Sequence, residues 1–370
     1  MKVLHVFKTV WPFTQGGLEE AIRQICLNTR TLAGAAVTHE VACIAPDGAP
    51  RRVAADYAEV RGWPARFALD SCPVAPGMLP TLWRAPAAYD IVHLHSPWPV
   101  PELALWPRPG GRAKRVVTYH ADIVGRTAAM RLYGPLQRRA LARCDAVVAT
   151  SAPYIDSSPV LARLPRRPRV IPLGLDPESY PVAPLDRLAA WADRLGQGFF
   201  LFLGVLRYYK GLAELCRAAA EAPAPVVIVG DGPLRAQVDA AAEAEPNLVA
   251  LGHLDDADRA ALLQLAGAVV LPSTQRAEAF GISLLEGAMA GKPLISTALG
   301  TGTDVVNRHG ETGLVVPPGD AGALARAMQA LHEDPEGAVA LGLAARDRFD
   351  AHYTGAAMGA AYGALYAELL

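Results

Sequence analysis

Two glutamates, Glu278 and Glu286, stand eight residues apart in a stretch that could hold a polar ligand. The second lies in the apolar run L-L-E-G-A-M. A carboxylate in such surroundings is costly unless it is hydrogen-bonded, and the two hydroxyls of a ribose would supply donors. The alternative is a solvated glutamate on the outer face of an amphipathic helix. If the span were helical it would cover roughly 12 Å, about the reach of a sugar ring, a diphosphate and a ribose.

Predicted elements on either side position these glutamates. The apolar run A-V-V-L at 268–271 is typical of a buried parallel strand. Ile282, Leu285 and Met289 recur at helical spacing, so we expect a short helix with that stripe facing the core. Gly281 would open this helix, and G-K-P at 291–293 would end it.

Two cations, Arg207 and Lys210, follow another apolar strand, at 199–204, in the loop before a predicted helix. Arginine can bind a diphosphate through two forked donors, and lysine adds a compact charge. Cations at a helix start oppose the helix dipole, so an anionic ligand would remove a conflict. The alternative is an ordinary solvated pair.

The first half of the chain offers two further candidates. Gly16 and Gly17 join the first strand to a helix, whose unpaired N–H groups suit an anion, although glycine also serves such turns simply by turning. His95 and His120 both end predicted parallel strands, where the ligand crevice of an open α/β sheet lies. Two histidines so placed favour a binding function and a packing function about equally.

The overall pattern is a βα alternation that occurs twice. At 370 residues the chain is too long for one ordinary core. We therefore expect an α/β protein of two doubly wound, Rossmann-like domains, 1–175 and 176–354, with a crevice between them. Residues 47–88 are expected to be mainly loop, with one or two short elements. With 52% hydrophobic and 19% charged residues and a net charge of −1, the sequence excludes a disordered chain and an obligate nucleic-acid binder.

The five cysteines are scattered and form no C-x-x-C pair, which indicates reduced thiols in a cytoplasmic protein. The first apolar run is too short for a signal peptide, and no apolar run is long enough to span a bilayer. Peripheral contact with the inner membrane is a further hypothesis, because basic and aromatic residues suit an anionic surface. The alternative is a solvated loop with core tryptophans. The residues concerned are Arg163, Arg166, Arg167, Arg169, Trp11, Phe13, Trp98 and Trp106.

Taken in order, the motifs resemble those of retaining glycosyltransferases of family 4 with the GT-B fold, over nearly the whole chain. The strongest motif is E-x7-E at 278–286. Supporting motifs are Q-G-G at 15–17, T-Y-H at 118–120, V-I-P-L-G-L-D at 170–176, L-R-Y-Y-K-G at 206–211, V-G-D-G-P at 229–233 and G-E-T-G-L-V-V-P-P-G-D at 310–320. The short segments F-K-T, H-S-P-W-P and T-Y-H-A-D-I-V are similar to segments of bacterial mannosyl- and rhamnosyltransferases of O-antigen and related polysaccharide assembly.

The resemblance implies a central cleft between the two domains, with the last helix, 355–370, packing back on the first. Glu286 would hold the ribose hydroxyls, and Glu278 would meet hydroxyls of the donor sugar. Arg207 and Lys210 would bind the diphosphate and stabilise it as leaving group. No metal and no cofactor are then expected beyond a nucleotide-sugar co-substrate. His120 would touch the sugar near the reacting carbon.

The other implied contacts come largely from the backbone. They are Phe280, Gly281 and Ile282 beside the donor sugar, Gly16 and Gly17 at the donor phosphate or the acceptor, and Leu254 at the base, with Asp256 nearby. The D-x-D sequence at 256–258 is expected to cap a helix rather than bind a metal.

We therefore expect transfer of a hexose, mannose or D-rhamnose, from a GDP-sugar to a lipid-linked or polysaccharide glycan. Retention could proceed by double displacement or by same-face attack, in which the leaving phosphate helps deprotonate the acceptor. The alternatives are a UDP-sugar-dependent glycosyltransferase, a nucleotide-sugar 2-epimerase and a non-catalytic nucleotide- or glycan-binding protein. A dehydrogenase is disfavoured, because G-D-G-P at 230–233 lacks the third glycine of a dinucleotide loop.

Overall fold

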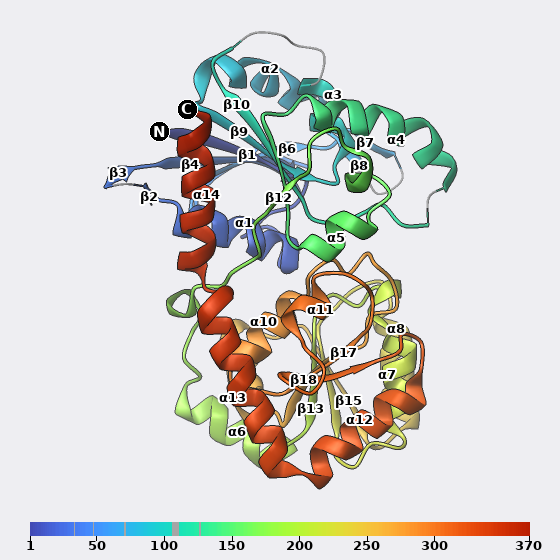
Figure 1. The fold of residues 1–370 in the computed structure, drawn as a ribbon. Helices are drawn as coiled ribbons and strands as arrows, with labels where there is room; N and C mark the ends of the chain where they lie inside the picture. Colours follow the sequence, from blue (N-terminus) through green and yellow to red (C-terminus); the bar gives the residue numbers. More distant parts are fainter. Residues whose placement is uncertain (33, 47, 70–71, 106–110, 126) are drawn as a thin grey trace. The chain divides into compact units, whose positions relative to one another are not determined.

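The computed structural model describes residues 1–370 apart from 33, 47, 70–71, 106–110 and 126. The chain divides into two compact units (Figure 1). Unit 1 comprises Met1–Gly174 together with Gly355–Leu370, and unit 2 comprises Leu175–Thr354. Each unit has its own largely parallel sheet, connected through helices, which is the Rossmann-like arrangement expected from the sequence.

Unit 1 is built on an eight-stranded sheet in which β5 is the antiparallel member. In spatial order its strands are β12 (Arg169–Val170), β11 (Ala146–Ala149), β10 (Lys114–Tyr119), β9 (Ile91–Ser96), β1 (Lys2–Val6), β4 (Thr38–Ala45), β6 (Glu59–Pro64) and β5 (Arg51–Ala54). The order reverses between β1 and β9, because successive connections run outward from these two neighbours in opposite directions.

Helices and short elements complete unit 1. The helices are α1 (Gly17–Asn28), α2 (Leu79–Ala88), α3 (Pro99–Leu105), α4 (Thr127–Ala142), α5 (Ala152–Ser157) and α14 (Gly355–Leu369). Two small hairpins pair β2 (Thr31–Leu32) with β3 (Ala35–Ala36) and β7 (Phe67–Leu69) with β8 (Cys72–Val74). The 3₁₀ turns span Pro76–Met78 and Leu161–Arg163.

The expectation that residues 47–88 are mainly loop is wrong. This stretch holds two strands of the main sheet, the β7–β8 hairpin and α2. In β6 only Val60 and Gly62 are buried, so the strand lacks the apolar run that identifies the central strands. Pairing with β4 gives β6 its conformation, and that tertiary contact overrides a weak local pattern.

Unit 2 is built on a six-stranded, wholly parallel sheet. Its strands are, in spatial order, β15 (Leu248–Gly252), β14 (Val226–Val229), β13 (Phe200–Leu203), β16 (Ala268–Leu271), β17 (Leu294–Thr297) and β18 (Gly313–Val316). The four central strands are buried at every position, so both faces are covered. This explains why their apolar runs were readable from the sequence.

The helices of unit 2 are α6 (Leu185–Leu195), α7 (Leu212–Ala219), α8 (Arg235–Ala244), α9 (Asp256–Leu265), α10 (Ile282–Met289), α11 (Thr303–Val306), α12 (Ala321–Glu333) and α13 (Pro335–His352), with 3₁₀ turns at Pro177–Ser179 and Tyr208–Lys210. Helix α6 was not anticipated. The helical stretch that begins at Ala321 is divided into α12 and α13, because Asp334 caps α13 by accepting from the N–H of Gly337 at 2.9 Å and Pro335 begins the new helix.

The last helix, α14, belongs to unit 1 and packs against α1 (Figure 1). Glycines at four-residue spacing form its contact face. A Cβ atom added at Gly359 would lie 2.2 Å from the carbonyl oxygen of Asn28, and one at Gly363 would lie 2.4 Å from a methyl of Leu32. At Gly359, α14 therefore approaches the end of α1 more closely than any side chain would allow, and Gly363 approaches β2 in the same way.

We expect Gly359→Val to lower the free energy of unfolding of unit 1 by about 2–3 kcal/mol, because the added methyl groups must displace backbone. Ala360→Val is the matched control, since Ala360 is exposed on the same helix. Urea unfolding followed by circular dichroism measures both variants. Equal stability of the two variants would show that the glycine face does not set the helix spacing.

Candidate active site

Two of the predicted site residues, one basic and one acidic, meet at the point where the strand order of unit 2 reverses. There β13 and β16 are neighbours, and ligands of open α/β sheets bind outside the carboxyl ends of such strands. Lys210 follows β13 and Glu278 follows β16. The Nζ atom of Lys210 lies 2.5 Å from Oε2 of Glu278.

Backbone contacts between the two loops hold this pair in place. The N–H of Thr274 donates to the carbonyl oxygen of Tyr209 at 2.8 Å. Gly211 adopts a left-handed conformation with φ 69°, and a Cβ atom there would lie 1.9 Å from the carbonyl oxygen of Pro272. Only glycine allows this approach, so the glycine of the L-R-Y-Y-K-G motif fixes where Lys210 lies.

The pair is nearly enclosed, with side chains 12% exposed for Lys210 and 10% for Glu278. Burial alone would lower the pKa of Lys210, but the Glu278 carboxylate and Tyr209 outweigh it and hold this pKa above its ordinary value. Ser273 donates its hydroxyl to Glu278 Oε2 at 3.0 Å. Because lysine carries three donors, the ammonium retains N–H groups for a ligand.

Arg207 lies at the start of the Tyr208–Lys210 turn and is exposed. Its carbonyl oxygen accepts from the N–H of Lys210 at 3.0 Å, but its side chain forms no hydrogen bond or ion pair with another residue in the described part of the chain. It is nevertheless close enough to lower the pKa of Lys210 electrostatically. The two predicted cations thus lie near each other, but only Lys210 is bound to an acid.

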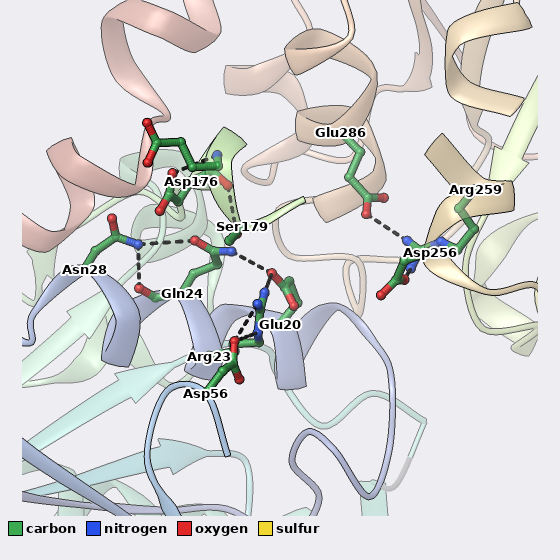
Figure 2. A network of polar contacts seen from close by, with 11 residues as sticks. Glu20, Arg23, Gln24, Asn28, Asp56, Asp176, Ser179, Asp256, Arg259 and Glu286 are labelled. Carbon is green, nitrogen blue, oxygen red and sulfur yellow. Dashed lines mark hydrogen bonds and ion pairs between the residues drawn. The ribbon is translucent and has the colours of Figure 1, made fainter. Parts of the chain in front are cut away.

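Glu286 is 4% exposed on α10, so the solvated-face alternative is wrong. Its Oε1 accepts from Nη2 of Arg259 at 2.8 Å, and Nη1 of Arg259 binds Oδ1 of Asp256 at 3.0 Å. Figure 2 shows Arg259 reaching both carboxylates. Sequence reasoning missed Arg259, because its partner lies 27 residues away and is brought there by the crossover of α9.

The helix that carries Glu286 is less one-sided than predicted. Ile282 and Met289, two of the three residues expected to face the core, are only half-buried, whereas positions 283 to 288 are all buried. A stripe was therefore the wrong description of this helix. Gly281 stands before it with no side-chain cap. The N–H of Leu284 donates to the carbonyl oxygen of Gly281 at 3.0 Å, so the N–H groups of Ile282 and Ser283 are the ones left open to a ligand. Phe280, beside Gly281, is buried.

The residues expected near the base flank the start of α9. Leu254 is half-buried and Asp256 is the first residue of the helix. The capping role assigned to the D-x-D sequence is one residue off, because Asp255 accepts from the N–H of Asp258 at 2.9 Å. The Asp258 carboxylate is bound by Arg187 and by Trp191 Nε1 at 2.8 Å. The two carboxylates of D-x-D therefore serve different partners.

In unit 1, Gly16 and Gly17 lie where predicted, at the start of α1. The backbone of Gly16 is extended, and no side chain caps the start of the helix. The first turn also carries Glu19 and Glu20, whose charges complement the helix dipole. Glu20 accepts from Gln24 at 2.7 Å and from Arg23 at 3.2 Å (Figure 2). This helix start is thus already supplied with negative charge.

His95 and His120 both lie at the carboxyl ends of neighbouring strands, as predicted. The Nδ1 atom of His95 is 2.9 Å from Nε2 of His120. Sequence reasoning missed His5 and His39, which continue the contacts: His5 is 3.1 Å from His95 on one side and 3.1 Å from His39 on the other. No local pattern in the sequence marks them, because His5 and His39 stand in separate strands and the pairing of β1 with β4 and β9 brings the rings together.

The surface proposed for membrane contact is only partly formed. Trp98 is fully buried and donates from Nε1 to the carbonyl oxygen of Pro73 at 3.2 Å, so it is a core residue. Trp106 lies outside the described residues. Arg167 pairs with Asp156 at 2.7 Å, and Arg169 pairs with Glu368. Within the part of the chain that is described, no helix combines the length and apolar character needed to cross a bilayer.

Comparison with known proteins decides the family. Residues 16–179 match the description "Glycosyltransferase Family 4", and residues 189–348 match "Glycosyl transferases group 1". The chain belongs to the family-4 glycosyltransferases. The D-rhamnosyltransferase WbpZ of Pseudomonas aeruginosa is 42% identical to this glycosyltransferase over 96% of the chain and 92% of WbpZ. The O-antigen chain mannosyltransferase C of Escherichia coli is 41% identical over 100% and 99% of the two chains.

Among solved structures, sucrose-phosphate synthase from Thermosynechococcus elongatus superposes with a TM-score of 0.81 at 22% identity. The match covers 100% of this glycosyltransferase and 98% of that chain. At this identity the likeness concerns the fold, which is GT-B. The protein is therefore a glycosyltransferase with two Rossmann-like units, as the sequence predicted.

We expect acid to destabilise unit 1. Burial lowers the pKa of His39 to about 4 and those of His93 and His120 to about 3, and it holds those of His5 and His95 well below their ordinary value. The unfolded chain takes up these protons near pH 6.5, so their contribution is complete above that pH. It falls by about 1.4 kcal/mol per histidine per pH unit as the pH drops toward 4.

Urea unfolding at pH 7.5, 6.0 and 5.0 measures this dependence. The histidines of unit 2 are all exposed and provide the internal reference. Unit 1 should lose stability more steeply than unit 2 below pH 6.5. Parallel behaviour of the two units would contradict the neutral, buried state of these imidazoles.

Proposed function

We propose that this glycosyltransferase moves mannose or D-rhamnose from a GDP-sugar to a glycan of the O-antigen type, with retention of configuration and without a metal. The names of two relatives that match nearly the whole chain, a D-rhamnosyltransferase and an O-antigen mannosyltransferase, support the sugar and the glycan. A lipid-linked acceptor would bring the protein to the cytoplasmic face of the inner membrane, where it would act peripherally.

The observation that carries the proposal is the Lys210–Glu278 pair at the switch point of unit 2. As the bond between the sugar and the diphosphate breaks, negative charge grows on the diphosphate. Lys210 and the exposed Arg207 supply fixed positive charge, and the open N–H groups at the start of α10 add dipoles. These groups can stabilise the leaving group without a divalent cation.

Glu286 and Arg259 suit the nucleoside end of the donor. The 2′- and 3′-hydroxyls of a ribose can donate to the Glu286 carboxylate, which Arg259 already orients through one oxygen. Because this carboxylate is 4% exposed, hydrogen bonds from the ribose hydroxyls would lower the cost of keeping it buried and charged. Leu254 and Asp256, at the start of α9, would then lie toward the base.

The environment of Glu278 favours same-face attack over double displacement. Its Oε2 is held by Lys210 and Ser273, which lowers its strength as a nucleophile. In the proposed step the acceptor oxygen forms a bond to the anomeric carbon while the carbon–phosphate oxygen bond breaks. The electron pair goes to the diphosphate, and a phosphate oxygen takes the acceptor's proton. Glu278 then serves to hold sugar hydroxyls.

Unit 1 would supply the acceptor side. The acidic first turn of α1 makes the Gly16–Gly17 helix start better suited to acceptor hydroxyls than to a phosphate. His120 would contact a hydroxyl of the transferred sugar.

Calorimetric titration with GDP, UDP and ADP tests the choice of base. We expect GDP to bind at least about tenfold more tightly than the other two, a difference of about 1.4 kcal/mol. Tighter binding of UDP would favour the UDP-sugar alternative. Release of free nucleotide with an altered sugar, in the absence of acceptor, would indicate an epimerase.

Lys210→Met and Glu286→Gln should each lower kcat with GDP-mannose or GDP-D-rhamnose at least about a hundredfold, because each removes a group that binds the donor. The control is Arg217→Met, whose side chain is 63% exposed on α7. Circular dichroism checks that the variants fold. Near-normal turnover in both variants would refute the assignment of this site.

A further inference from the structure

A row of four buried histidines crosses four adjacent strands of unit 1. His39 lies in β4, His5 in β1, His95 in β9, and His120 follows β10, and these strands are neighbours in that order. Their ring nitrogens join end to end at 3.1, 3.1 and 2.9 Å. We call this series, with Thr29 at its far end, the histidine row. The row crosses the position where the strand order of unit 1 reverses, between β1 and β9.

Thr29 gives the histidine row a direction. Its hydroxyl donates to the carbonyl oxygen of Ile25 at 2.6 Å, and it also lies 3.2 Å from Nε2 of His39. A hydroxyl has a single hydrogen. Since that hydrogen is used on Ile25, His39 must be the donor to Thr29, and its proton is on Nε2.

The direction then passes along the row. A neutral imidazole donates at one nitrogen and accepts at the other. With its proton on Nε2, His39 accepts at Nδ1 from Nε2 of His5. His5 in turn accepts at Nδ1 from Nε2 of His95, which accepts at Nδ1 from Nε2 of His120. All four rings therefore carry the proton on Nε2, and Nδ1 of His120 is left as an acceptor.

The end of the row at His120 is open. Among the described residues, Nδ1 of His120 has no hydrogen-bond partner. It is not one of the side-chain atoms that are fully buried and also lack a partner, which are Gln137 Oε1, Thr150 Oγ1 and Tyr180 OH. A second network restrains the rings from the side. His93 stacks on His95 with ring centres 4.5 Å apart and is bound by the hydroxyls of Tyr366 and Thr118, both at 2.7 Å.

We propose that Thr29, His39, His5 and His95 are positioning residues that hold His120 in one tautomer, so that its Nδ1 always accepts a hydrogen bond. A sugar hydroxyl can donate to that nitrogen, whereas a phosphate oxygen only accepts and would be repelled. The row thus selects a hydroxyl of the substrate at His120 and rejects the diphosphate. The assignment of this hydroxyl to the transferred sugar rests on the proposed function.

Two other functions fit the row less well. A proton relay needs an exit, but the row ends on the carbonyl oxygen of Ile25, which cannot carry a proton onward, and Thr29 is fully buried. A metal site is geometrically close for His5, His93 and His95, or for His5, Cys26 and His39. However, the ring nitrogens that a metal would need are already joined to one another or to hydroxyls.

Long-range ¹H–¹⁵N NMR spectra of the full-length protein, which distinguish protonated from bare ring nitrogens, test the proposal directly. For the wild-type protein near pH 7.5 we expect the proton on Nε2 in His5, His39, His95 and His120. Single His→Gln variants assign the signals. A proton on Nδ1 of His120, charged rings, or zinc retained in native mass spectra would overturn the proposal. This test needs no substrate, so its failure is distinct from failure of the proposed transfer.

A pair of variants at Thr29 tests the coupling. Thr29→Val removes the hydroxyl with little change of shape, so neither direction of the row is satisfied at that end and His120 should populate both tautomers. With the lost hydrogen bond at the sugar, kcat/KM should fall about tenfold. Thr29→Ser keeps the hydroxyl and should restore the wild-type spectrum and rate. A single Nε2 tautomer and an unchanged rate in Thr29→Val would show that Thr29 does not set the direction.

Discussion

The arrangement of unit 2 depends on the ion pair between Lys210 and Glu278, whose side chains are almost buried. Removing one partner of such a pair typically costs about 3–5 kcal/mol, because the other charge is left buried and unpaired. Lys210 and Glu278 therefore hold each other in position, and Glu278 helps to keep the pKa of Lys210 above its ordinary value. The strand order that brings β13 beside β16, the glycine at 211 and the contact between Thr274 and Tyr209 all serve to place them.

The two units carry different kinds of polar group at the same topological position. Both sheets reverse their strand order, and polar side chains gather at both reversals. In unit 2 the proposed ligand is an anion, the diphosphate of the donor, and the site is made of charges. In unit 1 the buried histidines stay neutral, because burial lowers their pKa values, and they act through the direction of their hydrogen bonds. A neutral row suits hydroxyl groups, which both donate and accept.

Whether a site residue could be predicted from the sequence depended on how far along the chain its contact partners lie. Glu278, Lys210 and the ends of the central strands could be placed because apolar runs and glycines mark them locally. Arg259 could not, because nothing near it in the chain indicates that α9 returns beside α10. The same holds for His5 and His39, which are ordinary strand residues until the neighbouring strand is known. The cap of α9 was misassigned by one residue because three aspartates compete within four positions.

The most direct test of the charged pair is a double-mutant cycle on turnover, with Lys210→Met, Glu278→Gln and the double variant assayed on the same GDP-sugar and acceptor. If the two side chains act as one unit on the departing diphosphate and its sugar, the double variant will be about as slow as the slower single variant. Losses that multiply, so that the double variant is slower by the product of the two single effects, would contradict the claim that the pair works as a unit.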